Sequence, residues 1–221
     1  MRCYNFPNPM STTKLHAGFG IQGQVTVRAY RAGMVELVAP FLELIRECRS
    51  QLNEDFSAAY KAHMRERIER QIRSIEAIKA AHFLRTAVKQ KNLIVQSPGY
   101  GLDIIIQRLV GINTYSLNIL YGEIGTGSTT PALTDTVLTT PTNRAAVGFQ
   151  QDYGTTDAIV QFFFSDSQLA NETYYEFGTF IDGTSTIGTG QLFNHALFGT
   201  PYAKTAGQDT TVECDFTIVN S

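Results

Sequence analysis

The sequence has little charge, few cysteines and no long apolar segment. Charged residues make up 17% of the 221 residues and hydrophobic residues 43%, which indicates a globular protein and excludes a collagen-like or wholly disordered chain. No apolar run approaches the roughly 18 residues that a membrane-spanning helix needs, so we expect no membrane contact. Residues 1–10 lack the continuous apolar core of a secretory signal, and we expect the chain to start in the cytoplasm of the cell that makes it.

The cysteines and histidines show no pattern that points to a disulfide framework or a metal site. They are Cys3, Cys48 and Cys214, together with His16, His63, His82 and His195. The cysteines are odd in number and never form a CxxC pair, and the histidines share no metal-ligand spacing. We therefore predict reduced, buried thiols, packing or surface roles for the histidines, and neither a metal nor a cofactor.

The overall charge of −2 combines two halves of opposite sign. Residues 1–108 hold 16 lysines and arginines against 9 acids, whereas residues 109–221 hold 2 against 11. Such a split can steer binding to nucleic acid, or it can let the basic part of one subunit dock on the acidic part of another. Because acids are interleaved with the basic residues, we favour self-assembly over nucleic-acid binding.

The N-terminal part contains an arm and the first strands. Residues 1–19 open with a mixture of Pro, Asn, Ser and Thr, which predicts an extended arm that orders only against another surface. Residues 20–30 alternate apolar and polar side chains and predict a strand. A turn signal follows at 31–33, and residues 34–38 predict a short returning strand that Pro40 ends.

Residues 41–91 predict a helical insertion. The segment has no Gly or Pro and repeats apolar residues at a spacing of three to four, which indicates two helices with a break near 50–55. The second helix combines an apolar stripe with several arginines. Solvent exposure, packing on a neighbour's acidic surface, and contact with nucleic acid inside a capsid are the alternatives for this face. The candidate subunit interface consists of Phe56, Tyr60, Arg65, Arg67, Arg70 and Arg73.

After Lys91 the sequence changes to Gly, Thr, Asn and aromatic residues in short alternating runs. Strands are predicted at 92–96, 115–121, 145–151, 158–165, 174–181, 191–197 and 210–219, and a short helix at 102–110 with Leu102, Ile105, Ile106 and Leu109 facing inward. This spacing is typical of an all-β sandwich or barrel. We predict a mainly β fold with an α insertion, in which an antiparallel β-sandwich of residues 20–40 and 92–221 is interrupted by a helical hairpin.

Three parts of the chain carry a resemblance to a known family. They are GQVTVRAYRAG at 23–33 with KNLIVQSPGYGLDIIIQRLVG at 91–111, IGTGSTTPALTDTVL at 124–138, and the closing strands at 176–218. Together they resemble a β-sandwich module that recurs in tail fibres, baseplate parts and other virion structural proteins of tailed bacteriophages. In that family the first strands run almost directly into the N-L-I strand. The resemblance therefore implies that the helical segment is inserted into a sandwich loop.

The resemblance implies a virion structural protein of the tail, baseplate or fibre attachment region. Such a protein acts by subunit assembly, without catalysis, and its partners are copies of itself and other virion proteins. Head decoration, or another capsid-associated role, is the alternative in the same class. In a different class, a carbohydrate-binding receptor module would bind a host surface glycan through exposed aromatic side chains.

Several motifs invite an enzymatic or metal-binding interpretation. The glycines at 122–127 are not followed by the Gly-Lys-Ser/Thr of a phosphate-binding loop, and no G-x-S-x-G elbow marks a serine hydrolase. The acids that would serve a paired-carboxylate hydrolase are Asp166, Glu172 and Glu176, and those that would bind calcium from loops are Asp152, Asp157 and Asp182. We favour solvated acids at strand ends for the first set, and no EF-hand or repeat pattern supports calcium binding by the second.

The aromatic residues have two interpretations. The run Phe162-Phe163-Phe164, with Tyr174, Tyr175, Phe177 and Phe180, predicts either a packed core or a sugar-binding platform, and we favour the core. Three consecutive phenylalanines place at least one ring on each face of a strand. The pair Asp182-Gly183 predicts a hairpin turn, because these residues adopt the positive φ angles that such turns need.

Overall fold

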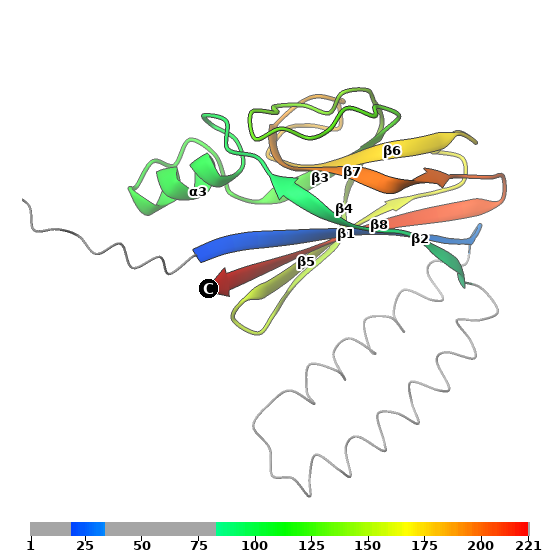
Figure 1. Ribbon diagram of the computed structural model, residues 1–221, viewed down its shortest axis with the longest axis horizontal. Helices are drawn as coiled ribbons and strands as arrows, with labels where there is room; N and C mark the ends of the chain where they lie inside the picture. The colour runs from blue at the N-terminus through cyan, green and yellow to red at the C-terminus, as the bar shows by residue number, and fades with distance from the viewer. Residues whose placement is uncertain (1–18, 34–82, 221) are drawn as a thin grey trace, which may run out of the picture.

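The computed structural model describes residues 19–33 and 83–220 (Figure 1). The predicted strand at 34–38, most of the predicted arm and most of the helical insertion lie outside the described residues. So do all six residues of the candidate subunit interface, Phe56, Tyr60, Arg65, Arg67, Arg70 and Arg73. Those predictions stand untested by the structure.

Eight strands and one short helix make up the described part. They are β1 Phe19–Arg31, β2 Phe83–Ile94, α3 Leu102–Leu109, β3 Ile119–Gly125, β4 Pro141–Tyr153, β5 Asp157–Phe164, β6 Thr173–Ile181, β7 Gln191–Ala203 and β8 Gln208–Asn220. The predicted strand at 115–121 begins four residues later, at Ile119. The other predicted strands after residue 140 are all present, and most of them extend further than the alternating pattern indicated.

The strands form a closed antiparallel barrel in the order β1-β2-β7-β6-β3-β4-β5-β8, so the predicted sandwich interrupted by a helical hairpin is wrong. Two long strands close the barrel. Strand β2 pairs with β1 along most of its length and with β7 at Leu93 and Ile94. Strand β4 pairs with β3 up to Ala146 and with β5 from Val147 onward. Because both strands pass from one sheet to the other, the described sheets have no open edge.

Residues 83–91 correct the predicted boundary of the helical insertion. They belong to strand β2, which pairs with β1 from Phe83, opposite Tyr30, to Asn92, opposite Gly23. Residues such as Lys and Gln have good helix propensity, which explains the sequence prediction. The pairing with β1 outweighs this preference, because strand propensity depends mainly on neighbouring strands and burial.

Aromatic and branched side chains fill the interior of the barrel. Phe162 and Phe164 are each 1% exposed, whereas Phe163 between them is 40% exposed, which confirms that the run places rings on both faces of its strand. Gly122 makes room for this packing, because a Cβ atom there would lie 2.6 Å from Phe177 and 2.8 Å from Phe162. The buried Tyr174, Phe177 and Phe180 confirm the packing prediction for these rings.

Two loops fold over the outside of the sheet that β3, β6 and β7 form, and they lie at the top of Figure 1. They are the β3–β4 loop, residues 126–140, and the β6–β7 loop, residues 182–190. Leu138 of the first loop packs with Val95, Phe180 and Leu192 in a small second core. In the second loop Asp182 and Gly183 have φ angles of 56° and 90°, which confirms the predicted turn chemistry.

Candidate functional site at one end of the barrel

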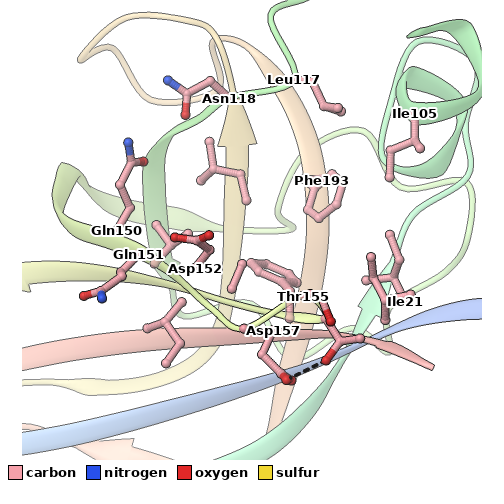
Figure 2. Close-up of a pocket in the computed structure, with 18 of the residues that line it drawn as sticks. Ile21, Ile105, Leu117, Asn118, Gln150, Gln151, Asp152, Thr155, Asp157 and Phe193 are labelled. Carbon is pink, nitrogen blue, oxygen red and sulfur yellow. Dashed lines mark hydrogen bonds between the residues drawn. The ribbon is translucent and has the colours of Figure 1, made fainter. Parts of the chain in front are cut away.

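A largely apolar pocket of about 660 Å³ opens at one end of the barrel (Figure 2). Strands β4 and β5 supply much of its wall, the ends of β1, β3, β6, β7 and β8 supply the rest, and helix α3 and the β4–β5 turn contribute to its rim. The apolar lining includes Ile21, Ile105, Leu117, Ile119, Phe193 and Phe216, and the polar lining includes Gln150, Gln151, Asp152, Thr155 and Asp157. Its size falls in the range of protein sites that bind ligands or peptide side chains.

Next to the pocket, helix α3 and the turn after it present a row of exposed apolar side chains. We call Ile106, Leu109, Val110 and Ile112 the apolar ledge; their exposed fractions are 58%, 77%, 69% and 48%. The predicted inward orientation of Ile106 and Leu109 is therefore wrong, and Ile104, at 1% exposure, is the buried residue of the helix. An eight-residue helix with three consecutive isoleucines fits the barrel in more than one rotation, so its sequence did not determine which face is buried.

Polar contacts hold the ledge in place. At the start of α3, Asp103 accepts hydrogen bonds from the Gly99 amide at 2.7 Å and from the Gln107 side chain at 2.6 Å. After the helix, Arg108 donates to the Asn113 side chain and to the Ser116 carbonyl. These bonds fix the turn around the exposed apolar residues, so the ledge is an ordered feature of the surface.

Leu117 connects the ledge to the pocket in a strained conformation. Its φ angle is 63°, in the left-handed region, which costs a residue with a Cβ atom about 1 kcal/mol. The neighbouring Ser116 amide donates to Asp182 at 3.0 Å and the Asn118 amide to the Ser116 hydroxyl at 3.0 Å. These contacts hold the backbone so that Leu117 lines the pocket, where Figure 2 shows it beside Asn118.

A buried polar cluster lies under the β3–β4 loop. Nε2 of His195 on β7 is 3.0 Å from Glu176 on β6, and Nδ1 is 2.8 Å from Asp135 in the loop. Glu176 is fully buried and also accepts the backbone amides of Gly127, Thr139 and Thr140, at 2.7–3.1 Å. The cluster therefore ties the loop to the sheet with charge-assisted hydrogen bonds.

The protonation of the cluster follows from these contacts. Burial acts to raise the pKa of Glu176, but its bonds to His195, Thr140 and Thr139 outweigh burial, and the pKa lies below 4.5. Burial acts to lower the pKa of His195, but the two carboxylates outweigh it, and the pKa lies above 6.5. Each ring nitrogen of His195 faces a carboxylate, and this arrangement favours the protonated imidazolium over the neutral ring. Both ring nitrogens thus take part in the contacts that hold the loop.

The acids proposed for catalysis have separate partners. Asp166 accepts Lys204 Nζ at 2.6 Å and the Gly207 amide at 3.0 Å, at the barrel end opposite the pocket, whereas Glu176 binds His195. The Lys204 bond, followed by the Gly207 amide, lowers the pKa of Asp166. Glu172 is exposed. Asp166 and Glu176 thus take part in two separate sets of contacts, and the structure does not bring them together as a carboxylate pair.

The remaining predicted site residues are also placed by the structure. Asp152 and Asp157 line the pocket, while Asp182 binds the Ser116 amide. Across residues 19–33 and 83–220, no group of three acids, histidines or cysteines is arranged to hold a metal ion. Cys214 is a free buried thiol, as predicted, and burial raises its pKa. Cys3, Cys48, His16, His63 and His82 lie outside the described residues.

Comparisons with family models, curated proteins and solved structures found no match to the chain. None of the helices in the described ranges has the length and apolarity to span a membrane.

The apolar ledge is the feature that sequence reasoning missed. The sequence does contain a signal for it, because Leu109 at the end of α3 is followed by Val110 and Ile112, on either side of Gly111, whose φ angle is 82°.

Proposed function

We propose that this chain is a bacteriophage virion structural protein of the tail, baseplate or fibre attachment region, which acts by subunit assembly without catalysis. The observation that carries the proposal is the apolar ledge beside the apolar pocket. Monomeric soluble proteins rarely expose contiguous large apolar patches, and such patches mark interaction surfaces. The resemblance of residues 23–33, 91–111, 124–138 and 176–218 to tailed-phage modules supports the virion setting.

The closed barrel determines the kind of contact that can form. Because the described strands pair around the whole barrel, a partner cannot join them by adding a strand to an open edge. Contacts with a partner must therefore use side-chain surfaces. The ledge already exposes four large apolar side chains in the folded barrel. The opposite charges of the two halves of the chain favour contacts between copies.

The exposed surface also bears on the two alternatives, head decoration and carbohydrate binding. A head decoration protein would use the ledge and the pocket in the same way, so it remains the alternative within this class. A carbohydrate-binding module needs exposed rings, and Phe162, Tyr174, Phe177 and Phe180 are buried. A glycan site would therefore have to use other aromatic residues, such as the exposed Phe163, and this alternative has less support.

Sedimentation velocity of the purified full-length chain tests the proposal. We expect species heavier than the 24.5 kDa monomer, with a fraction that grows with concentration. Leu109→Lys should weaken this association about tenfold or more, because a leucine buried in a contact contributes about 1.5–3 kcal/mol. The matched control is Ile187→Lys, which changes an apolar residue of 41% exposure in the β6–β7 loop. A wild-type chain that stays monomeric throughout would overturn the proposal.

A further inference from the structure

We propose that the pocket at the barrel end receives the N-terminal segment, residues 1–18, of a neighbouring copy of this chain. The inference rests on the proposed function, since it names the partner that the assembly surface binds. It is carried by three observations: where the chain enters the barrel, what the segment contains, and what lines the pocket.

The chain enters the barrel at the rim of the pocket. Strand β1 begins at Phe19, and Ile21, two residues later, is part of the pocket lining. Strand β1 pairs with β8 from its first residue, Phe19 opposite Asn220. Residues 1–18 of every copy therefore start beside a pocket, and in an assembly that joins barrel ends they start beside the neighbour's pocket as well.

The composition of residues 1–18 complements the pocket. The segment contains the apolar side chains of Tyr4, Phe6, Met10 and Leu15, carries Arg2 and Lys14, and has no acid. The pocket has apolar walls and the carboxylates of Asp152 and Asp157 in its lining. Within residues 19–33 and 83–220, the hydrogen bonds that Asp157 accepts come from the neutral hydroxyls of Thr156 and Thr217 rather than from a lysine or an arginine.

Two prolines favour an extended ligand. Pro7 and Pro9 flank Asn8 within the segment, and proline interrupts helices and removes backbone donors. Extended segments that contain proline lose little conformational entropy on binding and dock in apolar grooves. The described strands form a closed barrel without an open edge, so the pocket suits such a ligand better than it suits a strand that must form a ladder of hydrogen bonds.

The geometry favours a neighbour's segment over the chain's own. Strand β1 runs away from the pocket from its first residue, so a segment that entered the pocket of its own copy would have to turn back at the strand start. A segment from a neighbouring copy is free of this constraint. Eighteen residues reach up to about 60 Å when extended, which exceeds the roughly 43 Å of a thirteen-residue strand. The segment is thus long enough to cross to a second barrel.

A mixing experiment with two full-length variants tests the inference. Phe6→Asp impairs the segment and leaves the pocket intact, whereas Leu117→Asn impairs the pocket and leaves the segment intact. Asparagine tolerates the left-handed conformation at position 117, so the variant should fold at least as stably as wild type, which urea unfolding checks. Each variant alone should associate about tenfold or more weakly than wild type in sedimentation velocity.

An equimolar mixture of the two variants should associate more strongly than either variant alone, because the intact segment of one can enter the intact pocket of the other. The control Ile187→Asn should assemble as wild type does. If either variant alone assembles like wild type, or if the mixture stays monomeric, occupancy by a neighbour's segment is refuted while assembly itself stands. A wild-type chain that is monomeric would instead remove the proposed function and this inference with it.

Discussion

Arg144→Ala is expected to lower the free energy of unfolding by about 3–5 kcal/mol, because it leaves a buried carboxylate without its counter-charge. Arg144 and Glu123 are 1% and 0% exposed and form an ion pair between β4 and β3. The guanidinium also donates to the Thr189 carbonyl at 2.7 Å and lies 4.4 Å from the centre of the Tyr121 ring. Urea unfolding of the purified variant measures the loss.

Two further variants separate the charge effect from general damage. The double variant Glu123→Leu/Arg144→Met removes both charges and should recover much of the loss, since apolar replacements of a buried ion pair are often tolerated. Arg85→Ala removes an exposed arginine that donates to the Ala203 carbonyl, and it should change stability by less than about 1 kcal/mol. A cost near zero for Arg144→Ala would contradict a structural role for the pair.

Glu176→Gln should destabilise the protein by about 2–4 kcal/mol, although it changes a single atom. The carboxylate of Glu176 accepts hydrogen bonds from His195 and three backbone amides. In glutamine, an NH2 group replaces one of the two carboxylate oxygens. This NH2 group would face an N–H donor that now bonds to Glu176, and that donor would lose its acceptor. Glu172→Gln, an exposed change directly before β6, is the matched control and should have little effect in the same urea unfolding measurement.

The same cluster predicts a pH dependence of stability with two limbs. The pKa of His195 is raised in the folded protein, so its contribution is complete below 6.5 and is lost as the pH rises through the higher folded value. The pKa of Glu176 is lowered, so its contribution is present above 4.5 and is lost as the pH falls through the lower folded value. The contribution of the cluster is therefore largest between these limits.

His195→Gln isolates the alkaline limb. The difference in unfolding free energy between wild type and this variant should shrink as the pH rises above 6.5, because the wild-type imidazolium then loses its proton. Urea titrations at a series of pH values measure this difference. A difference that stays constant across the alkaline range would mean that His195 is neutral in the folded protein and that the cluster is not held by charge.

The sequence predicted the strands well because their alternation survives in the structure. Val212, Cys214 and Phe216 on β8 are buried in the core, as the period-two pattern indicated, but Ile218 of the same predicted set is 39% exposed. Closure into a barrel could not be predicted in this way, because alternation looks the same in a sandwich and in a barrel. The difference lies in β2 and β4, whose pairing passes from one neighbour to another partway along each strand.

The candidate site was less predictable than the strands. The cluster of Asp135, Glu176 and His195 depends on the pairing of β6 with β7 and on a loop that folds back over the sheet. No local spacing in the sequence encodes that contact. The ledge was missed because an inward-facing stripe was assumed for α3, whereas only Ile104 of the three consecutive isoleucines is fully buried. Tertiary packing, which determines the exposed face, is absent from the helix sequence itself.

The decisive measurement for the proposed virion role is electron cryomicroscopy of purified particles of the phage that would encode this chain. We expect density for the eight-stranded barrel in the tail, baseplate or fibre attachment region, with the ledge residues Ile106, Leu109, Val110 and Ile112 buried against another subunit. Particles in which the barrel is present with its ledge facing solvent, or purified particles that lack the chain altogether, would contradict it.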